Sequence, residues 1–181
     1  GRAKVDHQFT EFGDNYRGKT ILVTGAGGTI GSELCRQLLS CAPQKIVLLD
    51  NSELALYNID MDISAFAKES NIEIVPVLGS VNDARLVRSV FDLHQVDAVF
   101  HAAAYKHVPM VEINTLVGLE NNVLGTSTVA RAAHEAGVGK FILVSSDKAV
   151  RPTNVMGASK RLAELVIQDL ATRSNTVFSM V

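Results

Sequence analysis

Short runs of consecutive apolar residues alternate along the chain with longer segments in which apolar residues recur every three or four positions. A continuous apolar run predicts a strand that is buried on both faces, whereas the longer recurrence predicts an amphipathic helix. The predicted strands span residues 20–24, 45–50, 72–77, 97–101, 140–145 and 176–181. The predicted helices span residues 30–40, about 56–66, 83–94, about 111–136 and 155–172.

Each predicted helix has one apolar face that we expect to lie against a sheet. The expected inward residues of the first three helices are Ile30, Leu34, Leu38, Leu56, Ile59, Ile63, Phe66, Val87, Val90 and Phe91. Strands and helices alternate without hairpins, which predicts an α/β fold with a doubly wound parallel sheet and helices on both faces. Residues 1–19 show no period and are interpreted as a lead-in or linker, and residues 20–181 as one domain.

The composition fits one domain of this kind. The chain has 181 residues, of which 47% are hydrophobic and 20% charged, and its formal net charge is −2. This charge gives no reason to expect nucleic acid or an anionic membrane as a partner. The cysteines, Cys35 and Cys41, make neither a disulfide framework nor a metal site. No apolar run reaches the roughly 20 residues that span a bilayer. We therefore expect a soluble, cytoplasmic segment.

A glycine-rich segment, Thr-Gly-Ala-Gly-Gly-Thr-Ile-Gly, joins the first predicted strand to the first predicted helix. Its spacing is that of the dinucleotide-binding fingerprint. Gly25 permits a tight turn, Gly28 lets backbone amides approach a pyrophosphate, and Gly31 allows the helix to pack closely on the sheet. Thr29 and Ile30 open the helix, whose N-terminus favours an anion. We expect a Rossmann-type domain that binds a dinucleotide here; a purely structural turn is the alternative.

Asp50 ends the second predicted strand, where a carboxylate accepts hydrogen bonds from the hydroxyl groups of the adenosine ribose. The same charge repels a 2′-phosphate, and the next residues, Asn51 and Ser52, bring no cation. NAD is therefore favoured, and NADP stays open as an alternative cofactor. A second interpretation makes Asp50 only a cap of the following helix.

The end of the fifth predicted strand carries Ser145, Ser146, Asp147 and Lys148, at the edge where open α/β sheets bind ligands. Met156 and Lys160 follow, one turn apart on one helix face. The chain resembles the nucleoside-diphosphate-sugar 4,6-dehydratases of bacterial polysaccharide biosynthesis, and in particular the UDP-N-acetylglucosamine 4,6-dehydratases. These enzymes belong to the extended short-chain dehydrogenase/reductase family. The resemblance rests on the glycine loop, the His-Ala-Ala-Ala-Tyr-Lys-His-Val-Pro run at 101–109, the Asn-Asn-Val-Leu-Gly-Thr run at 121–126 and the whole segment 145–160.

The resemblance implies that a hydride leaves sugar C4 for the nicotinamide, that water is then eliminated across C5 and C6, and that the hydride returns to C6. Such chemistry needs an acid for the C6 hydroxyl and a base for the C5 proton. By position, Asp147 is implied as the acid and Lys148 as the base, which burial beside Lys160 would make partly neutral. Ser146 is implied to hydrogen-bond the C4 oxygen, and Lys160 to hold the nicotinamide ribose.

Met156 departs from the broader family, which has Tyr at this position. A thioether has no ionisable proton, so Met156 cannot deprotonate the C4 hydroxyl. The base for that step is left open among Ser146 acting through Lys160, Asp147 and a water molecule. A sugar-nucleotide 4-epimerase is the alternative enzyme, disfavoured because epimerases use Tyr there, and a non-catalytic NAD-binding module is the alternative from another class.

The remaining contacts carry less weight. Ser80 and Val81 are expected to flank the adenine, Lys106 to reach the diphosphate of the sugar nucleotide, and Asn122 to order a water or backbone group near Lys160. His101 and His107 are interpreted as structural histidines. Small or polar side chains that complete the expected cofactor site are Ala102, Ala103, Ala104 and Ser145.

The chain ends on a predicted strand, and the family's substrate domain, which follows that strand, is missing. We therefore expect a fragment that binds cofactor and turns over weakly or not at all. Its expected partners are a UDP-sugar and a second copy, paired through long helices, without nucleic acid and without membrane contact by this segment. The resemblance also implies that the parent protein is anchored at the inner membrane.

Overall fold

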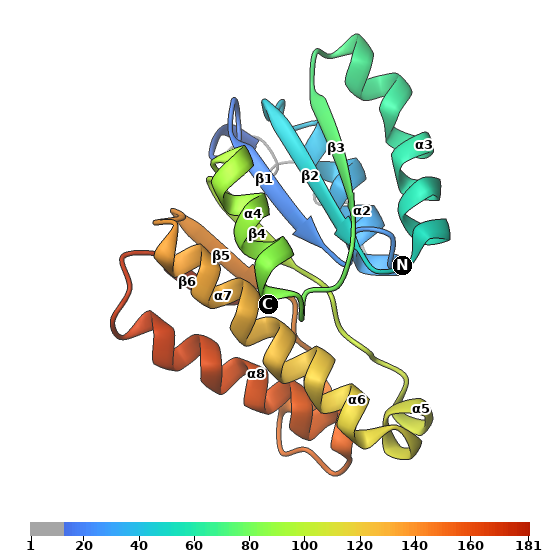
Figure 1. Cartoon of the computed structure of the whole chain (residues 1–181), viewed down its shortest axis with the longest axis vertical. Coiled ribbons are helices and arrows are strands. Elements are labelled where there is room, and N and C mark those ends of the chain that lie inside the picture. Colours follow the sequence, from blue (N-terminus) through green and yellow to red (C-terminus); the bar gives the residue numbers. More distant parts are fainter. Residues whose placement is uncertain (1–12) are drawn as a thin grey trace, which may run out of the picture.

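The computed structural model describes residues 13–181, and in it one parallel sheet has the strand order β3-β2-β1-β4-β5-β6 (Figure 1). The register places Thr24 beside both Leu49 and His101, so the carboxyl ends of β1, β2 and β4 meet at one edge. The strands are β1 (Thr20–Thr24), β2 (Lys45–Asp50), β3 (Glu73–Leu78), β4 (Ala98–His101), β5 (Lys140–Leu143) and β6 (Val177–Met180). The predicted doubly wound parallel sheet is confirmed.

Helices cover both faces of the sheet, each face with its own apolar core. The helices α2 (Thr29–Leu39) and α3 (Glu53–Glu69) pack on one face. The helices α4 (Ala84–His94), α7 (Gly125–Glu135) and α8 (Val155–Ala171) pack on the other. None of the helices within residues 13–181 combines the length and the apolar character needed to cross a membrane.

The predicted helix at 111–136 is wrong as a continuous element. The segment instead folds as α5 (Val108–Ile113), α6 (Thr115–Leu119), the π-helical turn η1 (Glu120–Leu124) and then α7. Asn114, with φ −118° and ψ 51°, breaks the helix, and its side-chain amide donates to the carbonyl oxygen of Met110. A Cβ on Gly118 would lie 2.6 Å from Cγ1 of Val111, so α6 packs too closely on α5 to continue it in a straight line.

Two apolar residues expected in the core face outward. Ile30, in the first turn of α2, is 50% exposed, and Phe66 is 51% exposed. Ala67 instead takes the inward position at the end of α3. The inward residues predicted for α4 are buried as expected: Val87, Val90 and Phe91.

Candidate functional site

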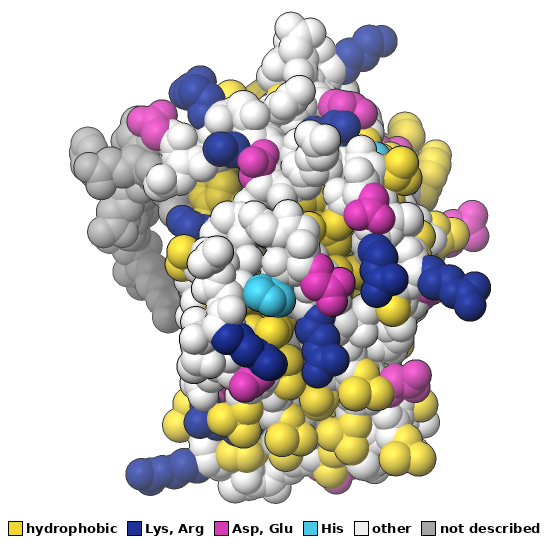
Figure 2. Space-filling view, turned by 60° about the vertical axis from the view of Figure 1, so that its left-hand side comes forward, with side chains coloured by type: hydrophobic (Ala, Val, Ile, Leu, Met, Phe, Trp, Pro, Cys, Tyr) yellow, Lys and Arg dark blue, Asp and Glu magenta, His cyan; other side chains and the backbone are white. Residues whose placement is uncertain are grey.

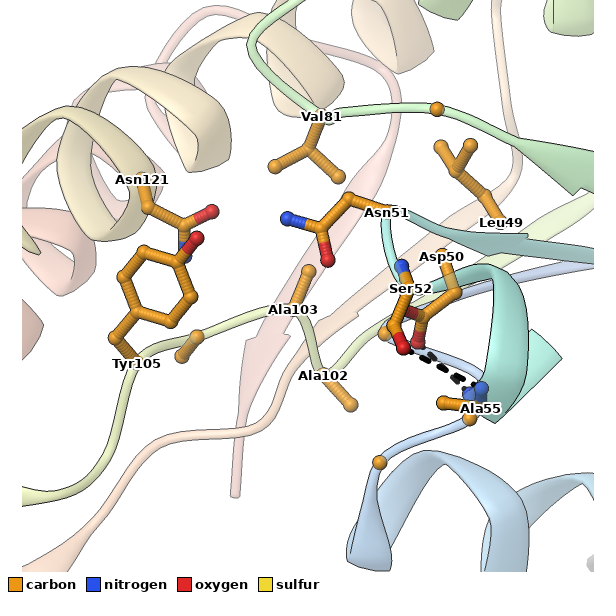
Figure 3. Close-up of a pocket in the computed structure, with 15 residues that line it drawn as sticks. Leu49, Asp50, Asn51, Ser52, Ala55, Val81, Ala102, Ala103, Tyr105 and Asn121 are labelled. Atoms are coloured by element: carbon orange, nitrogen blue, oxygen red, sulfur yellow. Dashed lines mark hydrogen bonds between the residues drawn. The ribbon is translucent and has the colours of Figure 1, made fainter. Parts of the chain in front are cut away.

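A cavity of about 230 Å³ opens at the carboxyl edge of β1, β2 and β4, where the strand order reverses (Figure 3). Open α/β sheets bind ligands at this position. Val81 and Ala103 point into the cavity from opposite sides, and the Asn51 side chain points across it toward Tyr105 and Asn121. Its lining is Gly25, Gly27, Gly28, Leu49, Asp50, Asn51, Ser52, Ala55, Gly79, Val81, Ala102, Ala103, Ala104, Tyr105 and Asn121.

The glycine loop lies against neighbouring backbone with no room for side chains. Gly25 has φ +64°, and a Cβ there would lie 2.7 Å from the amide nitrogen of Ala103. A Cβ on Gly31 would lie 1.9 Å from the carbonyl oxygen of Gly25. The loop backbone is thereby exposed to the cavity, and α2 starts there with no acidic residue in its first turn. Both features suit an anionic group at the helix N-terminus.

Asp50 fixes the loop on its β2 side. Its Oδ2 accepts a hydrogen bond from the Gly27 amide at 2.9 Å, and its Oδ1 accepts one from the Ser52 amide at 2.9 Å. The interpretation of Asp50 as the cap of the next helix is wrong, because Ser52 is the N-cap of α3 and its Oγ accepts from the Ala55 amide (Figure 3). Each carboxylate oxygen keeps a further lone pair for a ligand.

Ser80 and Lys106, two other residues predicted to contact ligands, do not line this cavity. The Oγ of Ser80 accepts a hydrogen bond from the Asn82 amide at 3.1 Å. Lys106, expected on the sugar nucleotide, lies over the start of α2, where its Nζ donates to Oγ1 of Thr29 at 3.2 Å. The structure therefore places this ammonium group beside the glycine loop.

Sequence reasoning missed several residues that line the cavity, among them Gly27, Asn51, Tyr105 and Asn121. Gly27 stands within the glycine loop, so its backbone role had a signal in the sequence. Tyr105 and Asn121 stand within recognised motifs, but nothing in the sequence shows that they face the same cavity as Asp50.

Asn122, in η1, joins three segments near this edge of the sheet. Its Oδ1 accepts from the Tyr105 amide at 2.8 Å, and its Nδ2 donates to the Tyr105 carbonyl at 3.0 Å and to Oγ of Ser159 at 2.9 Å. Asn122 is 1% exposed. The side chain therefore orders the Tyr105 backbone and ties the loop after β4 to α8 at Ser159, next to Lys160 in sequence.

A buried hydrogen-bond chain runs below the cavity from β1 to η1. Oγ1 of Thr126 donates to the Asn122 carbonyl at 2.7 Å, so it accepts at its contact with Nε2 of His101, 2.9 Å away. His101 therefore carries its proton on Nε2 and accepts from Thr24 through Nδ1 at 2.7 Å. Burial, and then the charge of Lys160, lower the pKa of His101 to about 3. His101 is a structural histidine, as interpreted from the sequence.

Lys160 is buried on α8, and its Nζ donates to the Val144 carbonyl at the end of β5, 2.6 Å away. Burial lowers the pKa of this ammonium group to about 8, and nearby Glu164 opposes the shift. The adjacent Ser145 hydroxyl donates to Oε1 of Glu164 at 2.5 Å. A lysine that carries its charge at a buried sheet edge presents a strong hydrogen-bond donor to a ligand.

The segment after Ser145 brings three predicted catalytic side chains together in the 3₁₀ turn η2 (Asp147–Ala149). Ser146 Oγ donates to Oδ1 of Asp147 and accepts from the Lys148 amide, each at 3.2 Å, and Nζ of Lys148 lies 3.8 Å from the same Asp147 oxygen. The expected burial of Lys148 is wrong, because its side chain is 53% exposed. The charged side chains of this turn are exposed, whereas Met156 in the first turn of α8 is buried.

The fold and this edge of the sheet define a Rossmann-type α/β domain. The sequence model of the polysaccharide biosynthesis protein family matches residues 21–181, and the chain belongs to that family. It is 47% identical over 170 residues to the capsular polysaccharide biosynthesis protein CapD of Staphylococcus aureus, covering 94% of this chain and 28% of that protein.

Two named enzymes are more distant relatives. A UDP-N-acetylglucosamine 4,6-dehydratase (inverting) of Campylobacter jejuni is 32% identical, with 91% of this chain and 48% of that protein covered. A UDP-glucose 4-epimerase of Rickettsia canadensis is 35% identical, with 81% and 42% covered. The chain thus spans less than half the length of each of these relatives.

Solved structures share the fold. Pen from Bacillus thuringiensis superposes with a TM-score of 0.82 at 30% identity, over 91% of this chain and 51% of that one. The dTDP-glucose 4,6-dehydratase DesIV from Streptomyces venezuelae, solved with NAD, superposes with a TM-score of 0.76 at 29% identity, over 88% and 54%.

Proposed function

We propose that this chain is the NAD-binding part of a nucleotide-sugar 4,6-dehydratase that acts on UDP-N-acetylglucosamine. The observation that carries the proposal is the cluster at the end of β5, where buried Lys160 and the Ser146–Asp147–Lys148 turn lie at the same sheet edge as the cavity. Similarity to a UDP-N-acetylglucosamine 4,6-dehydratase supports the substrate, and similarity to an NAD-bound dehydratase supports the cofactor.

The described residues fit a dinucleotide. The glycines leave the loop backbone uncovered, so that a diphosphate could approach its amides. Lys106, hydrogen-bonded to Thr29 at the start of α2, adds a cation there. Asp50 would hold the adenosine ribose, Val81 and the alanines 102–104 would flank the adenosine, and Lys160 would hold the nicotinamide ribose. NAD supplies reversible hydride acceptance when it is bound. The Asp50 carboxylate supports NAD rather than NADP.

The side chains of the η2 turn have separate tasks in this proposal. Asp147 donates a proton to the departing C6 hydroxyl, Lys148 accepts the C5 proton, and Ser146 donates a hydrogen bond to the C4 oxygen. Because the Lys148 side chain is exposed in this chain, the proposal needs a further surface that covers the turn around the sugar.

Met156 separates this proposal from a 4-epimerase, which is the alternative enzyme. Its buried thioether offers neither a proton nor a base for the C4 hydroxyl. The base for that proton is one of three groups: Asp147, a water molecule, or Ser146 passing its own proton on toward Lys160. Met156 also favours the second candidate, a cofactor-binding module without turnover.

The test is to supply UDP-N-acetylglucosamine to the full-length protein that contains this chain and to identify the product by NMR. A 4-keto-6-deoxy sugar supports the proposal, and Asp147→Asn should lower its formation by about a hundredfold or more. A 4-epimer as product, or unchanged sugar despite bound NAD, would reject the dehydratase in favour of one of the two alternatives.

We also propose a dimer paired through the helices of the α7–α8 face. Large apolar side chains are exposed on α8 and on the segment that leads into α7: Leu162 and Leu165 of α8 (45% each), Leu116 of α6 (82%) and Leu124 of η1 (59%). Figure 2 shows hydrophobic side chains gathered in the lower part of the molecule, at the height where Figure 1 places α6 and α8. A patch of this kind marks an association surface in a soluble protein.

A further inference from the structure

Glu164 on α8 stands one turn beyond Lys160 and has no part in the chemistry described so far. Its side chain is only 14% exposed. Oε1 accepts the hydrogen bond from the Ser145 hydroxyl at 2.5 Å, and Oε2 accepts one from Nη1 of Arg161 at 2.8 Å. The carboxylate thus connects the helix that carries Lys160 with Ser145, two residues after the end of β5.

The contact with Glu164 decides what Ser145 offers to a ligand. A hydroxyl group has one proton, and the proton of Ser145 is directed to Oε1 of Glu164. Its oxygen is therefore left as an acceptor. Because the Ser145 amide also donates to the Val181 carbonyl at 2.7 Å, both the backbone and the side chain of Ser145 are fixed.

The same carboxylate acts on the charge of Lys160. The ammonium group is held by the carbonyl of Val144, the neighbour of Ser145, and burial disfavours its charged form. Among the described residues, Glu164 one turn along α8 favours the charge, and neighbouring His101 of β4 is neutral near pH 7. Glu164, which also pairs with Arg161, therefore brings a negative charge to the side of buried Lys160.

We infer that Glu164 is a positioning residue, whose carboxylate orients the Ser145 hydroxyl and holds Lys160 in its charged form at the end of β5. The inference deepens the proposed function, since Lys160 and Ser145 are the groups proposed to meet the cofactor. It predicts two separable effects of Glu164, one on the protonation of Lys160 and one on the orientation of Ser145.

The first test reads protonation without turnover. In the chain labelled with 13C-lysine, the Cε signal of Lys160, assigned by its loss in Lys160→Gln, is followed against pH. Glu164→Gln removes the charge but keeps an acceptor for Ser145, and it should lower the midpoint below the wild-type value of about 8. Asp169→Asn, which neutralises another carboxylate of the same helix, is the matched control and should leave the midpoint in place.

An unchanged midpoint in Glu164→Gln overturns the role in protonation. Should that variant fail to fold, Glu164→Asp serves instead, because its side chain is one methylene shorter and holds the carboxylate farther from Lys160. It should lower the Lys160 midpoint by a smaller amount, and an unchanged midpoint would likewise overturn the role in protonation. Because neither result depends on NAD, a protein that shows the shift yet binds no NAD would sink the proposed function and leave this inference standing.

The second test concerns orientation. Ser145→Ala removes the hydrogen bond but keeps the Glu164 charge, so the Lys160 midpoint should stay near that of the wild type while NAD affinity falls about three- to tenfold. Isothermal titration calorimetry with NAD gives the affinity. If Ser145→Ala binds NAD as tightly as the wild type, the oriented Ser145 hydroxyl makes no useful contact with NAD. That result would overturn the positioning role of Glu164 toward Ser145.

Discussion

At the scale of single residues, Gly31 is the position with the least room. A Cβ there would meet the Gly25 carbonyl at 1.9 Å, so Gly31→Ala must move the loop or the start of α2. We expect a loss of about 2–3 kcal/mol in the free energy of unfolding and at least a tenfold weaker binding of NAD. Gly139→Ala, whose Cβ would lie 3.4 Å from the Asp97 carbonyl, is the control. Urea unfolding and calorimetry check both, and wild-type NAD affinity in Gly31→Ala would contradict the assignment of the loop.

His101 links stability to pH. Its pKa in the folded chain is about 3, below the roughly 6.5 of an unfolded histidine, so the unfolded chain binds the proton more readily. The stabilisation is therefore complete above about pH 6.5 and is lost as the pH falls toward 3. His101→Gln should remove this contribution, so that the variant loses about 1 kcal/mol less than the wild type between pH 7 and 5.5. Denaturant titrations at the two pH values give the free energies of unfolding. If the variant and the wild type lose the same free energy of unfolding between pH 7 and 5.5, the prediction is refuted.

At the scale of elements, the position of the η2 turn depends on Gly157 in the first turn of α8. A Cβ on Gly157 would lie 2.3 Å from the Lys148 carbonyl, so Gly157→Ala pushes the turn away from the helix. Since no residue of η2 lines the cavity proposed for NAD, we expect kcat of the full-length protein to fall at least tenfold while the Kd for NAD changes less than twofold. A parallel loss of NAD binding would show that η2 and the cavity are not independent.

The strands and most element boundaries were predictable because continuous apolar runs and helical periods are strong signals. The break at Asn114 was not, since it depends on the contact of Gly118 with Val111, which no local pattern encodes. The outward positions of Ile30 and Phe66 were also not predictable. Periodicity indicates which face of a helix is apolar, but it does not show how far along the helix that face is covered. In the site, the glycine loop followed from spacing, whereas Glu164 became visible only when β5 and α8 were placed together.

At the scale of the whole molecule, the apolar residues of the α7–α8 face predict self-association. Leu165→Glu places a charge among them and should weaken the dimer at least tenfold, as measured by sedimentation equilibrium. Leu54→Glu, at a site that is 71% exposed on α3 across the sheet, is the control and should keep the wild-type dissociation constant. A wild-type chain that sediments as a monomer at high concentration would exclude the pairing.

The two backbone bonds of Asp50 have an evolutionary consequence. One carboxylate holds the Gly27 and Ser52 amides and also faces the place proposed for the ribose. Selection for an intact loop alone would retain this side chain, and discrimination against a phosphorylated ribose would be inherited with it. Descendants that change their coenzyme would therefore have to alter Asn51, an exposed neighbour in the cavity wall, before they could dispense with Asp50.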